Sequence, residues 1–496
     1  MNRDKLDQLC QEATKKMNAG DFEGALNLAY QIRSLGPHYA VSHAVSGLFI
    51  DTGFELGKEE IVKEGIELLK EDFESIINHK EYAPTAYYNL ANGYCNLFHF
   101  KMMKDPHAAY FRKTELDSAR VYYRKALEYH LQNAMLASQI FVNLGNCFDT
   151  LGRVVDALEC YEESLKWKPD HGMALGNKGI ALRYYALVCG EHQATYLIEA
   201  YSLLSQALKL GVLPEAVNTF SKYLEDIKKR FLDKETLDKP PKFPGYKIDA
   251  ESEFERFLVE FCLKNKLYLN ICNFCQQCDA AIGDTAVIKR MIARRRKVRT
   301  LSAYLNQIKQ DYVSARFLLV LSRYKELNLD FVDRYVTIIN TADYSMHNIY
   351  IQLVKTAFKS FYNILDKIAC FINNYLELDI PERHIVFRKI WLSKRKKVRK
   401  EIGKTKNPSL NALFDIHRGF RKDGPYKKLQ NIRNTLTHRF VSIRMLQEAE
   451  DEENMSEDML VKHTVELARI VRNAIIYLLY FVDTEEGKKE RALKID

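Results

Sequence analysis

The sequence predicts an all-α protein, in which a solenoid of helical repeats is followed by a helical bundle. Residues 1–230 contain a motif that returns after 34 residues, as expected for a repeat array. In the second half, apolar residues recur at helical spacing over long segments. The 496 residues include only 11 Pro and 21 Gly, so few positions interrupt a helix. A chain of this length can bury large cores and divide into domains.

The repeat unit is clearest between residues 143 and 170. The tripeptide NLG at 143–145 returns as NKG at 177–179. Four residues stand where a tetratricopeptide repeat has its small, aromatic and helix-ending residues, namely Gly145, Ala157, Tyr161 and Pro169. By this period and these residues, the region resembles the tetratricopeptide repeat family. We expect about four or five helical pairs that share a continuous core and present a concave face.

Asparagines gather on the first helices of these units, which line the inner face in tetratricopeptide arrays. They are Asn89, Asn92, Asn143, Asn146 and Asn177. An Asn amide can hydrogen-bond the backbone of a bound peptide, so we predict a peptide- or protein-binding site on the concave face. The alternative is a structural scaffold without a separate ligand, in which these residues cap and pack.

A proline-rich stretch separates the two halves of the chain. Lys234–Gly245 contains three Pro and a Gly after a long helical pattern. We therefore predict a repeat domain at 1–232, a linker at 233–248 and a helical domain at 249–496.

Three cysteines follow the linker in a CxxCxxC pattern, at Cys272, Cys275 and Cys278. A zinc site needs a fourth ligand, and only Cys262 could supply it nearby, because no His lies close in the sequence. Buried Cys pack as small apolar groups, which is the interpretation we prefer. We predict no metal and no cofactor, although the pattern leaves open whether these three residues bind a metal.

The chain is modestly basic, with a net charge of +9, which is compatible with nucleic acid binding. Seven of the eleven residues in Lys289–Arg299 are basic, and Lys394–Lys400 forms a second cluster. The candidates for contact with an RNA backbone are Arg294, Arg295, Arg296, Lys297 and Arg299. The alternative is a solvated face, or a pairing surface for the acidic segments Glu448–Glu453 and Glu457–Asp458.

Hydropathy and cysteine usage bear on location. No run of about 18 apolar residues occurs, so we predict no membrane span. The 10 Cys are scattered and the N-terminal segment is polar and amphipathic. Reduced thiols in a cytoplasmic protein are the simplest interpretation.

The segment Asn431–Arg439 carries the residue types that cut RNA without a metal. RNA supplies its own nucleophile, the 2′-OH, so cleavage needs a base, an acid for the leaving 5′-oxygen, and positive charge beside the phosphate. His438 can serve as base or acid, because an imidazole titrates near ~6.5. Arg433 offers a fixed fork of donors to phosphate oxygens. Asn434 shares a helix face with His438, four residues later.

The spacing of Arg433 and His438 sets a geometric condition. Five residues correspond to roughly 140° around a helix. The two side chains converge only if Arg433 sits at an irregular helix start, or if two chains each supply part of the site. The apolar helices expected at Ile349–Leu378 and Ile470–Val482 would offer surface for such a dimer. Asp366, within the first of them, could orient His438 or Arg433, or could form an ordinary salt bridge.

Several blocks in a fixed order resemble the HEPN superfamily, specifically a branch found behind tetratricopeptide repeats. They are Asp311–Leu319, Lys355–Tyr375, Val386–Trp391, Asn407–Leu410 and Arg433–Phe440. The resemblance covers about residues 246–443, with a last helix to about Asp483. It implies a helical domain, usually dimeric, that cuts RNA with the Arg and the His at the dimer interface. The branch has an acidic residue just before the His, where this chain has Thr437.

The function expected from these features is a metal-independent endoribonuclease that is regulated by its repeats and leaves a 2′,3′-cyclic phosphate and a 5′-OH. The resemblance adds a role as a toxin or defence effector. A first alternative is a non-catalytic module, in which the repeats recruit a partner and the bundle forms a dimer. A second is a nucleotide-binding partner of a transferase. The chain has no GxxxxGK[ST] loop, so we do not expect it to be the transferase itself.

Overall fold

The structure is a computed structural model of a chain in which helices form nearly all of the regular secondary structure. It describes residues 3–106, 113–129, 131–189, 192–231, 235–238, 245–272, 274, 278–339, 345–395, 397–439, 441–444 and 454–493. Within these ranges the only strands are β1 (Ser442–Ile443) and β2 (Asn454–Met455), which pair in parallel. The all-α prediction is confirmed.

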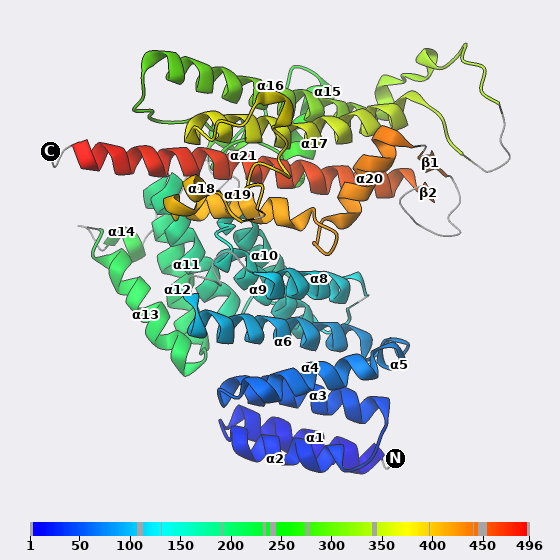
Figure 1. Cartoon of the computed structure of the whole chain (residues 1–496), viewed down its shortest axis with the longest axis vertical. Coiled ribbons are helices and arrows are strands. Elements are labelled where there is room, and N and C mark those ends of the chain that lie inside the picture. Colours follow the sequence, from blue (N-terminus) through cyan, green and yellow to red (C-terminus); the bar gives the residue numbers. More distant parts are fainter. Residues whose placement is uncertain are drawn as a thin grey trace.

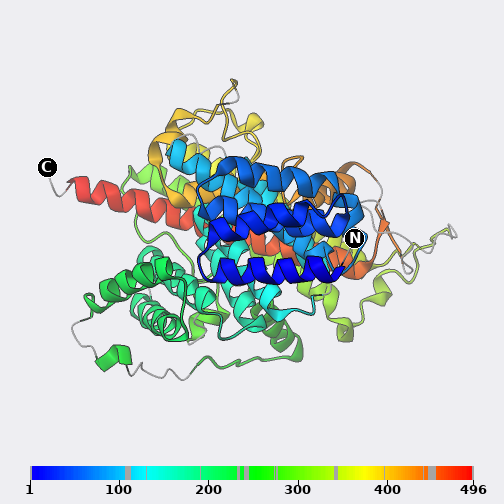
Figure 2. The same ribbon diagram turned by 90° about the horizontal axis from the view of Figure 1, so that it is seen from below.

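The first half is a stack of antiparallel helix pairs (Figure 1), and Figure 2 views the stack from its N-terminal end. The pairs are α1 (Arg3–Asn18) with α2 (Phe22–Arg33), α3 (Tyr39–Glu55) with α4 (Glu59–Glu71), α6 (Ala83–Lys104) with α8 (Thr114–Glu128), α9 (Ala134–Thr150) with α10 (Val154–Trp167), and α11 (Gly172–Cys189) with α12 (Gln193–Leu210). The short α5 (Phe73–Ile77) precedes α6, and α13 (Pro214–Lys228) ends the stack. Gly145 shows why small residues recur, because a Cβ at this position would lie 2.5 Å from the ring of Tyr161.

The second half is built around three long helices. They are α16 (Arg295–Arg323), α17 (Ile349–Leu376) and α21 (Glu457–Leu493), and α17 packs on both of the others. The shorter helices are α15 (Glu253–Lys264), α18 (Lys400–Thr405), α19 (Pro408–Gly419) and α20 (Lys427–His438), with 3-10 turns at Asp279–Ile282, Lys325–Leu327, Asp330–Val332 and Glu382–His384. The helix expected at Ile349–Leu378 is thus observed almost to the residue, capped by the Asn348 side chain.

Helix α21 lies between the two layers of the molecule, with α16 and α17 on one side and α19 and the repeats on the other (Figure 1). All residues of Ile470–Val482 are buried as a result. The apolar face of α17 is likewise covered inside the chain. The expectation that these two helices offer a dimer surface is therefore wrong, because their apolar side chains fill the core of one chain.

The repeats and the bundle share one hydrophobic core, which runs from Tyr87 in α6 to Val482 in α21. Of the predicted linker at 233–248, the structure describes a one-turn helix, α14 (Glu235–Asp238), and irregular chain from residue 245 onward. The boundary itself stays a prediction. None of the described helices has the length and apolarity that crossing a membrane requires.

Candidate functional site

Helix α20 begins directly after a tight turn that links it to α19. A Cβ at Gly424 would lie 2.3 Å from the carbonyl oxygen of Gly419, and a Cβ at Gly419 would lie 2.4 Å from the ring of Tyr426. Tyr426 is buried and stands immediately before the first residue of α20. The turn therefore tolerates no side chain at either glycine, which fixes the start of α20 relative to α19.

Arg433 and Asn434 are held against α17 by a chain of hydrogen bonds. The Tyr362 hydroxyl donates to Gln430 Oε1 at 2.5 Å, and Gln430 Nε2 donates to Asn434 Oδ1 at 2.9 Å. Arg433 Nη1 donates to the same Asn434 oxygen at 3.4 Å, and its guanidinium carbon lies 5.3 Å from the centroid of the Tyr362 ring. The arginine is thus half-buried and oriented, while Asn434 remains exposed.

Asp366 lies on α17, one turn after Tyr362. Its Oδ1 accepts a hydrogen bond from the Phe387 amide at 2.8 Å. Burial raises the pKa of Asp366, while the Phe387 amide and the charge of Arg433 act to lower it. The carboxyl group is therefore within electrostatic range of Arg433, as an orienting residue would need to be. Its orienting role stays a prediction.

His438 is the last residue of α20 and is exposed. The helix is continuous from Lys427 to His438, so Arg433 does not stand at an irregular helix start and that alternative is wrong. On a regular helix the two side chains diverge by roughly 140°. Thr437, in the place of the acidic residue, donates its hydroxyl to the Arg433 carbonyl at 2.7 Å.

The cluster Arg294–Arg299 lies at the start of α16, far from α20. Lys297 pairs with Glu377 and donates to the Tyr375 carbonyl at 3.2 Å, near the C-terminal end of α17. Tyr375 and Tyr362 are about 20 Å apart along α17, at a rise of about 1.5 Å per residue. The four arginines are exposed. Of the proposed acidic partners, Glu448–Glu453 lies outside the described residues. Glu457 and Asp458 pair with Arg323, at the other end of α16.

Arg388, which precedes the second basic cluster in the sequence, lies near the candidate site. Burial raises the pKa of Tyr362 to about 12, while the charges of Arg388 and Arg433 act to lower it. Arg388 also lines a cavity of about 1020 Å³, in which half of the lining residues are basic: His384, Arg388, Lys389, Lys394, Arg395 and Arg399. Arg388 and Lys389 stand outside the charge run at Lys394–Lys400, so the run alone does not indicate them.

Three of the five candidate asparagines line a groove on the repeats. The groove has a volume of about 630 Å³, and its lining includes Asn92, Asn143 and Asn146 with Asp51 and Glu55. The surrounding protein and, to a smaller degree, the charge of Glu55 raise the pKa of Asp51 to about 7.

Four of the five asparagines also form hydrogen bonds with other protein groups, and the fifth, Asn89, packs against a glycine. Asn92 accepts from the Tyr123 hydroxyl at 2.6 Å, Asn143 donates to Asn92 at 3.2 Å, and Asn146 accepts from Tyr161 at 2.8 Å and from Asn177 at 2.9 Å. Asn89 packs against Gly47, where an added Cβ would lie 2.8 Å from Asn89 Nδ2.

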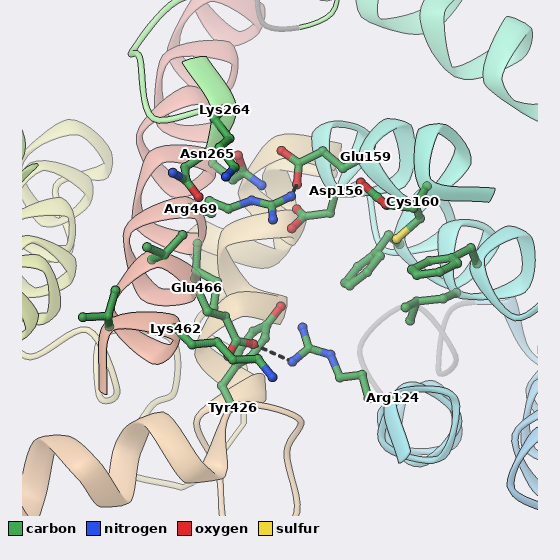
Figure 3. Close-up of a pocket in the computed structure, with 18 of the residues that line it drawn as sticks. Arg124, Asp156, Glu159, Cys160, Lys264, Asn265, Tyr426, Lys462, Glu466 and Arg469 are labelled. Atoms are coloured by element: carbon green, nitrogen blue, oxygen red, sulfur yellow. Dashed lines mark hydrogen bonds and ion pairs between the residues drawn. The ribbon is translucent and has the colours of Figure 1, made fainter. Parts of the chain in front are cut away.

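A second cavity, of about 690 Å³, lies between the repeats and α21 (Figure 3). Arg124 of α8 and Glu466 of α21 face each other across it and form an ion pair of 2.7 Å. The guanidinium carbon of Arg124 also lies 5.0 Å from the centroid of the Tyr426 ring, and that of Arg153 lies 5.5 Å from it. Two repeat arginines therefore cover the residue that precedes α20.

Ion pairs in the same region bind the repeats to α21. Arg469 and Arg472 both contact Glu159 of α10. Burial alone would raise the pKa of Glu159, but the charges of these arginines outweigh it and lower the pKa to about 2. Sequence reasoning missed this network, because its partners stand more than 300 residues apart and only the fold brings them together.

Comparison with known protein families finds one match in each half of the chain. Residues 292–485 match the family model for LA2681-like HEPN, and residues 138–171 match the tetratricopeptide repeat model. No curated protein matches the chain.

Solved structures with similar helical repeats include two crystal structures of MamA. They are each 20% identical, cover 42% and 44% of this chain and 98% and 97% of theirs, and have TM-scores of 0.28 and 0.25. The TPR2AB domain of yeast Sti1, in a complex with pHSP90, is 11% identical, covers 46% of this chain and 100% of its own, and has a TM-score of 0.18.

Proposed function

Because this chain combines a tetratricopeptide repeat with an LA2681-like HEPN domain, we propose that it is a metal-independent endoribonuclease regulated by its repeats. The observation that carries the proposal is the oriented Arg433, which is held over Tyr362 and beside Asn434 on a helix that ends in an exposed His438. The use of such a nuclease as a toxin or defence effector follows from the family resemblance alone.

Each residue of the site has a role in this chemistry. His438 takes the proton from the 2′-OH or gives one to the leaving 5′-oxygen, since an imidazole does both near neutral pH. Arg433 stabilises the added negative charge on the phosphate through its planar donors. Asn434 positions the substrate or the imidazole. The products are a 2′,3′-cyclic phosphate and a 5′-OH.

The regular helix makes a second copy of the chain part of the proposal. Arg433 and His438 diverge on α20, so one phosphate meets both types of residue only in a cleft between two α20 helices. A surface for such contact is the connection between α16 and α17, whose apolar side chains are exposed: Leu327, Phe331, Val332, Tyr335, Val336, Ile338 and Ile339. This arm, defined as residues 327–339, projects at the upper right of Figure 1.

Ser345 and Met346, which follow the arm in the sequence, lie next to the segment that follows α20. The Met346 amide donates to the Ile443 carbonyl at 2.7 Å, and the hydroxyls of Ser345 and Ser442 are 2.6 Å apart. Ile443 follows His438 by five residues. A partner chain that covers the arm would therefore approach the exposed imidazole, and exposed apolar area of this kind commonly marks an interface.

A path for the RNA is offered by the basic cavity around Arg388. One of its cations, Arg388, acts with Arg433 on the pKa of Tyr362, which links the cavity to the candidate site. Replacing Arg388 and Lys389 with Ser should weaken RNA binding and flatten its dependence on salt. The same change at Arg294 and Arg295 should have a smaller effect. Equal effects of the two pairs would contradict this assignment.

Regulation would act through the joint between the repeats and α20. Arg124 and Arg153 cover Tyr426, and the tight turn at Gly419 transmits any shift of Tyr426 to α19. A ligand that moves α8 or the start of α10 would therefore change the position of α20. The groove on the repeats offers the amides of Asn92, Asn143 and Asn146 to the backbone of a protein segment, so a non-catalytic module that binds such a partner is the second candidate.

The experiment that tests the proposal uses the full-length protein with RNA in EDTA. Cleavage should persist and leave cyclic-phosphate ends, whereas a strict Mg²⁺ requirement or 5′-phosphate ends would refute the mechanism. Arg433→Ala and His438→Ala should each abolish cleavage. Lys428→Ala, at an exposed position in the first turn of the same helix, is the matched control and should cut normally. Equal RNA cleavage by the native protein and all three variants would mean that Arg433 and His438 do not cut RNA, which would favour the non-catalytic module.

A further inference from the structure

Two cysteines and a histidine from opposite halves of the chain meet in the structure. Cys272 Sγ and Cys278 Sγ are 3.5 Å apart, and His192 Nε2 lies 3.9 Å from each of them. His192 Nδ1 is 3.6 Å from Cys272 Sγ. The ligand atoms of the three residues all lie within 4.8 Å of one another. The sequence contains no His near the CxxCxxC pattern, and the fold supplies one from 80 residues upstream.

These distances fit a tetrahedral zinc ion. With Zn–S bonds of about 2.3 Å and Zn–N bonds of about 2.05 Å, two sulfurs should be about 3.8 Å apart, and a sulfur and a nitrogen about 3.6 Å. The observed triangle of 3.5, 3.9 and 3.9 Å differs from this by a few tenths of an ångström. Two thiolates with one imidazole also form a ligand set that favours zinc over the hard cations.

The loop that carries the cysteines is built to hold them in place. Asn270 is fully buried, and its Nδ2 donates to the carbonyls of Ala280 at 2.7 Å and Gly283 at 2.8 Å. Both carbonyls belong to residues that follow Cys278 in the sequence. Its Oδ1 accepts from the Cys272 amide at 2.9 Å. One side chain therefore closes the loop from residue 270 to 283 and brings Cys272 and Cys278 together.

The repeats contribute the other side of the cluster. His192 stands between α11 and α12 with a φ of 54°, in the left-handed region that non-glycine residues seldom adopt. The hydroxyls of Tyr185 in α11 and Tyr196 in α12 both donate to the Ile271 carbonyl, next to Cys272. The imidazole and the thiols are thus fixed from two sides before any ion binds.

We propose that Cys272, Cys278 and His192 bind a zinc ion, which links the last helix pair of the repeats to the loop that precedes α16. The fourth position is taken by a water or by one further thiol. Zinc displaces the protons of the two thiols and binds His192 as a neutral imidazole. Because the ligands come from both halves of the chain, the ion stabilises the joint between them and takes no part in RNA cleavage.

The test begins with the full-length protein purified under reducing conditions without chelator. Mass spectrometry of the metals should find about one zinc per chain. Cys278→Ala and His192→Ala should each reduce zinc content about tenfold or more, since a lost ligand weakens binding at least as much as a lost outer partner. Cys370→Ser, at a half-buried thiol on α17, is the control and should retain its zinc.

Two further measurements separate ligation from a general loss of folding. His192→Cys supplies a different zinc ligand at the same place, so it should retain zinc where His192→Ala does not. A strong zinc chelator should lower the thermal unfolding midpoint of the native protein and of His192→Cys, but leave that of His192→Ala unchanged. Cobalt in place of zinc should give the absorption bands of a tetrahedral site with thiolate ligands.

Three results would overturn the proposal. The first is a native protein that holds no zinc and takes up none from added zinc under reducing conditions. The second is equal zinc in His192→Ala and the native protein. The third is a disulfide between Cys272 and Cys278 in protein prepared with a reductant. The two cysteines would then form a redox-active pair and would not be zinc ligands. EDTA would also remove this zinc, so zinc content and helicity are measured in the same sample as the cleavage activity. A loss of activity caused by loss of zinc and of structure is then distinguished from a failure of the proposed cleavage mechanism.

Discussion

Asp415 of α19 is a buried carboxylate on which the joint between repeats and bundle depends. It is 2% exposed and accepts hydrogen bonds from Arg120 at 2.8 and 3.0 Å and from Arg153 at 3.2 Å, both of which are 0% exposed. Burial alone would raise the pKa of Asp415, but the charges of these arginines outweigh burial and lower this pKa. Replacing Asp415 with Asn keeps the size of the side chain and removes its charge.

The expected cost follows from the charges that remain. The cluster contains three guanidinium groups and three carboxylates: Arg120, Arg153, Arg418, Asp117, Asp156 and Asp415. Breaking a buried ion pair from one side typically costs about 3–5 kcal/mol. Arg120 keeps Asp117 at 2.8 Å and Arg153 keeps Asp156 at 2.7 Å, so neither arginine loses its last carboxylate. We therefore expect a loss near the lower end, about 3 kcal/mol of the free energy of unfolding.

Urea unfolding of the full-length protein, followed by circular dichroism, measures this loss. Asp423→Asn, at an exposed carboxylate in the turn before α20, is the matched control and should change stability by less than about 0.5 kcal/mol. A loss for Asp415→Asn below about 1 kcal/mol, the range of exposed ion pairs, would refute the reasoning. It would mean that water reaches the joint and that the repeats are only loosely attached to α19.

Three further predictions concern the site, the pH dependence and the linker. Mixing the inactive Arg433→Ala and His438→Ala proteins should restore up to about half of the native activity in verified heterodimers, because one of the two shared clefts is then complete; no recovery would mean that each site takes both residues from one chain or needs all four. Burial lowers the pKa of His417 from 6.5 to about 3, so the unfolded chain binds this proton first and stability falls as the pH drops below 6.5. This group should contribute about 1.4 kcal/mol of loss at pH 5.5, and His417→Phe should remove that part of the pH dependence in denaturant titrations. Limited proteolysis should cut between about residues 231 and 248, yet the two fragments should elute together in gel filtration, because one core joins them; fragments that separate would contradict the shared core.

Much of the fold could be predicted from the sequence, because local patterns carry it. The period of 34 residues with Gly145 and Tyr161 predicted close helix pairs, and the apolar spacing of Ile349–Leu378 predicted α17 almost to its ends. The last helix was expected to end at about Asp483 and is longer at its C-terminal end, since α21 continues to Leu493. Its last turns carry charged side chains, which contact the segment before α16, at Lys289 and Arg290, in place of an apolar core.

The arrangement of the site could be predicted only in part. The residue types at Arg433, Asn434 and His438 indicate the chemistry, but the partner of Arg433 is the ring of Tyr362, which no spacing rule connects to it. The same limit applies to His192 and Cys272, which stand 80 residues apart. Contacts between distant segments depend on how helices pack, and the sequence pattern specifies which face is buried but not which element covers it.

The position of α20 offers a route by which the repeats would govern the proposed nuclease site without contacting its residues. The helix is fixed at its start by Tyr426, which Arg124 and Arg153 of the repeats cover, and at its centre by Gln430, which bonds to Tyr362 of α17. Between these two points α20 makes about one turn, so a displacement at Tyr426 cannot be absorbed before it reaches Arg433. The Glu466 carboxylate sets the position of Arg124 from α21. A partner that competes for Arg124 would therefore release the start of α20, while the hydrogen bond between Gln430 and Tyr362 of α17 is kept. Helix α20 would then tilt, which would move Arg433 and His438 relative to the proposed second chain.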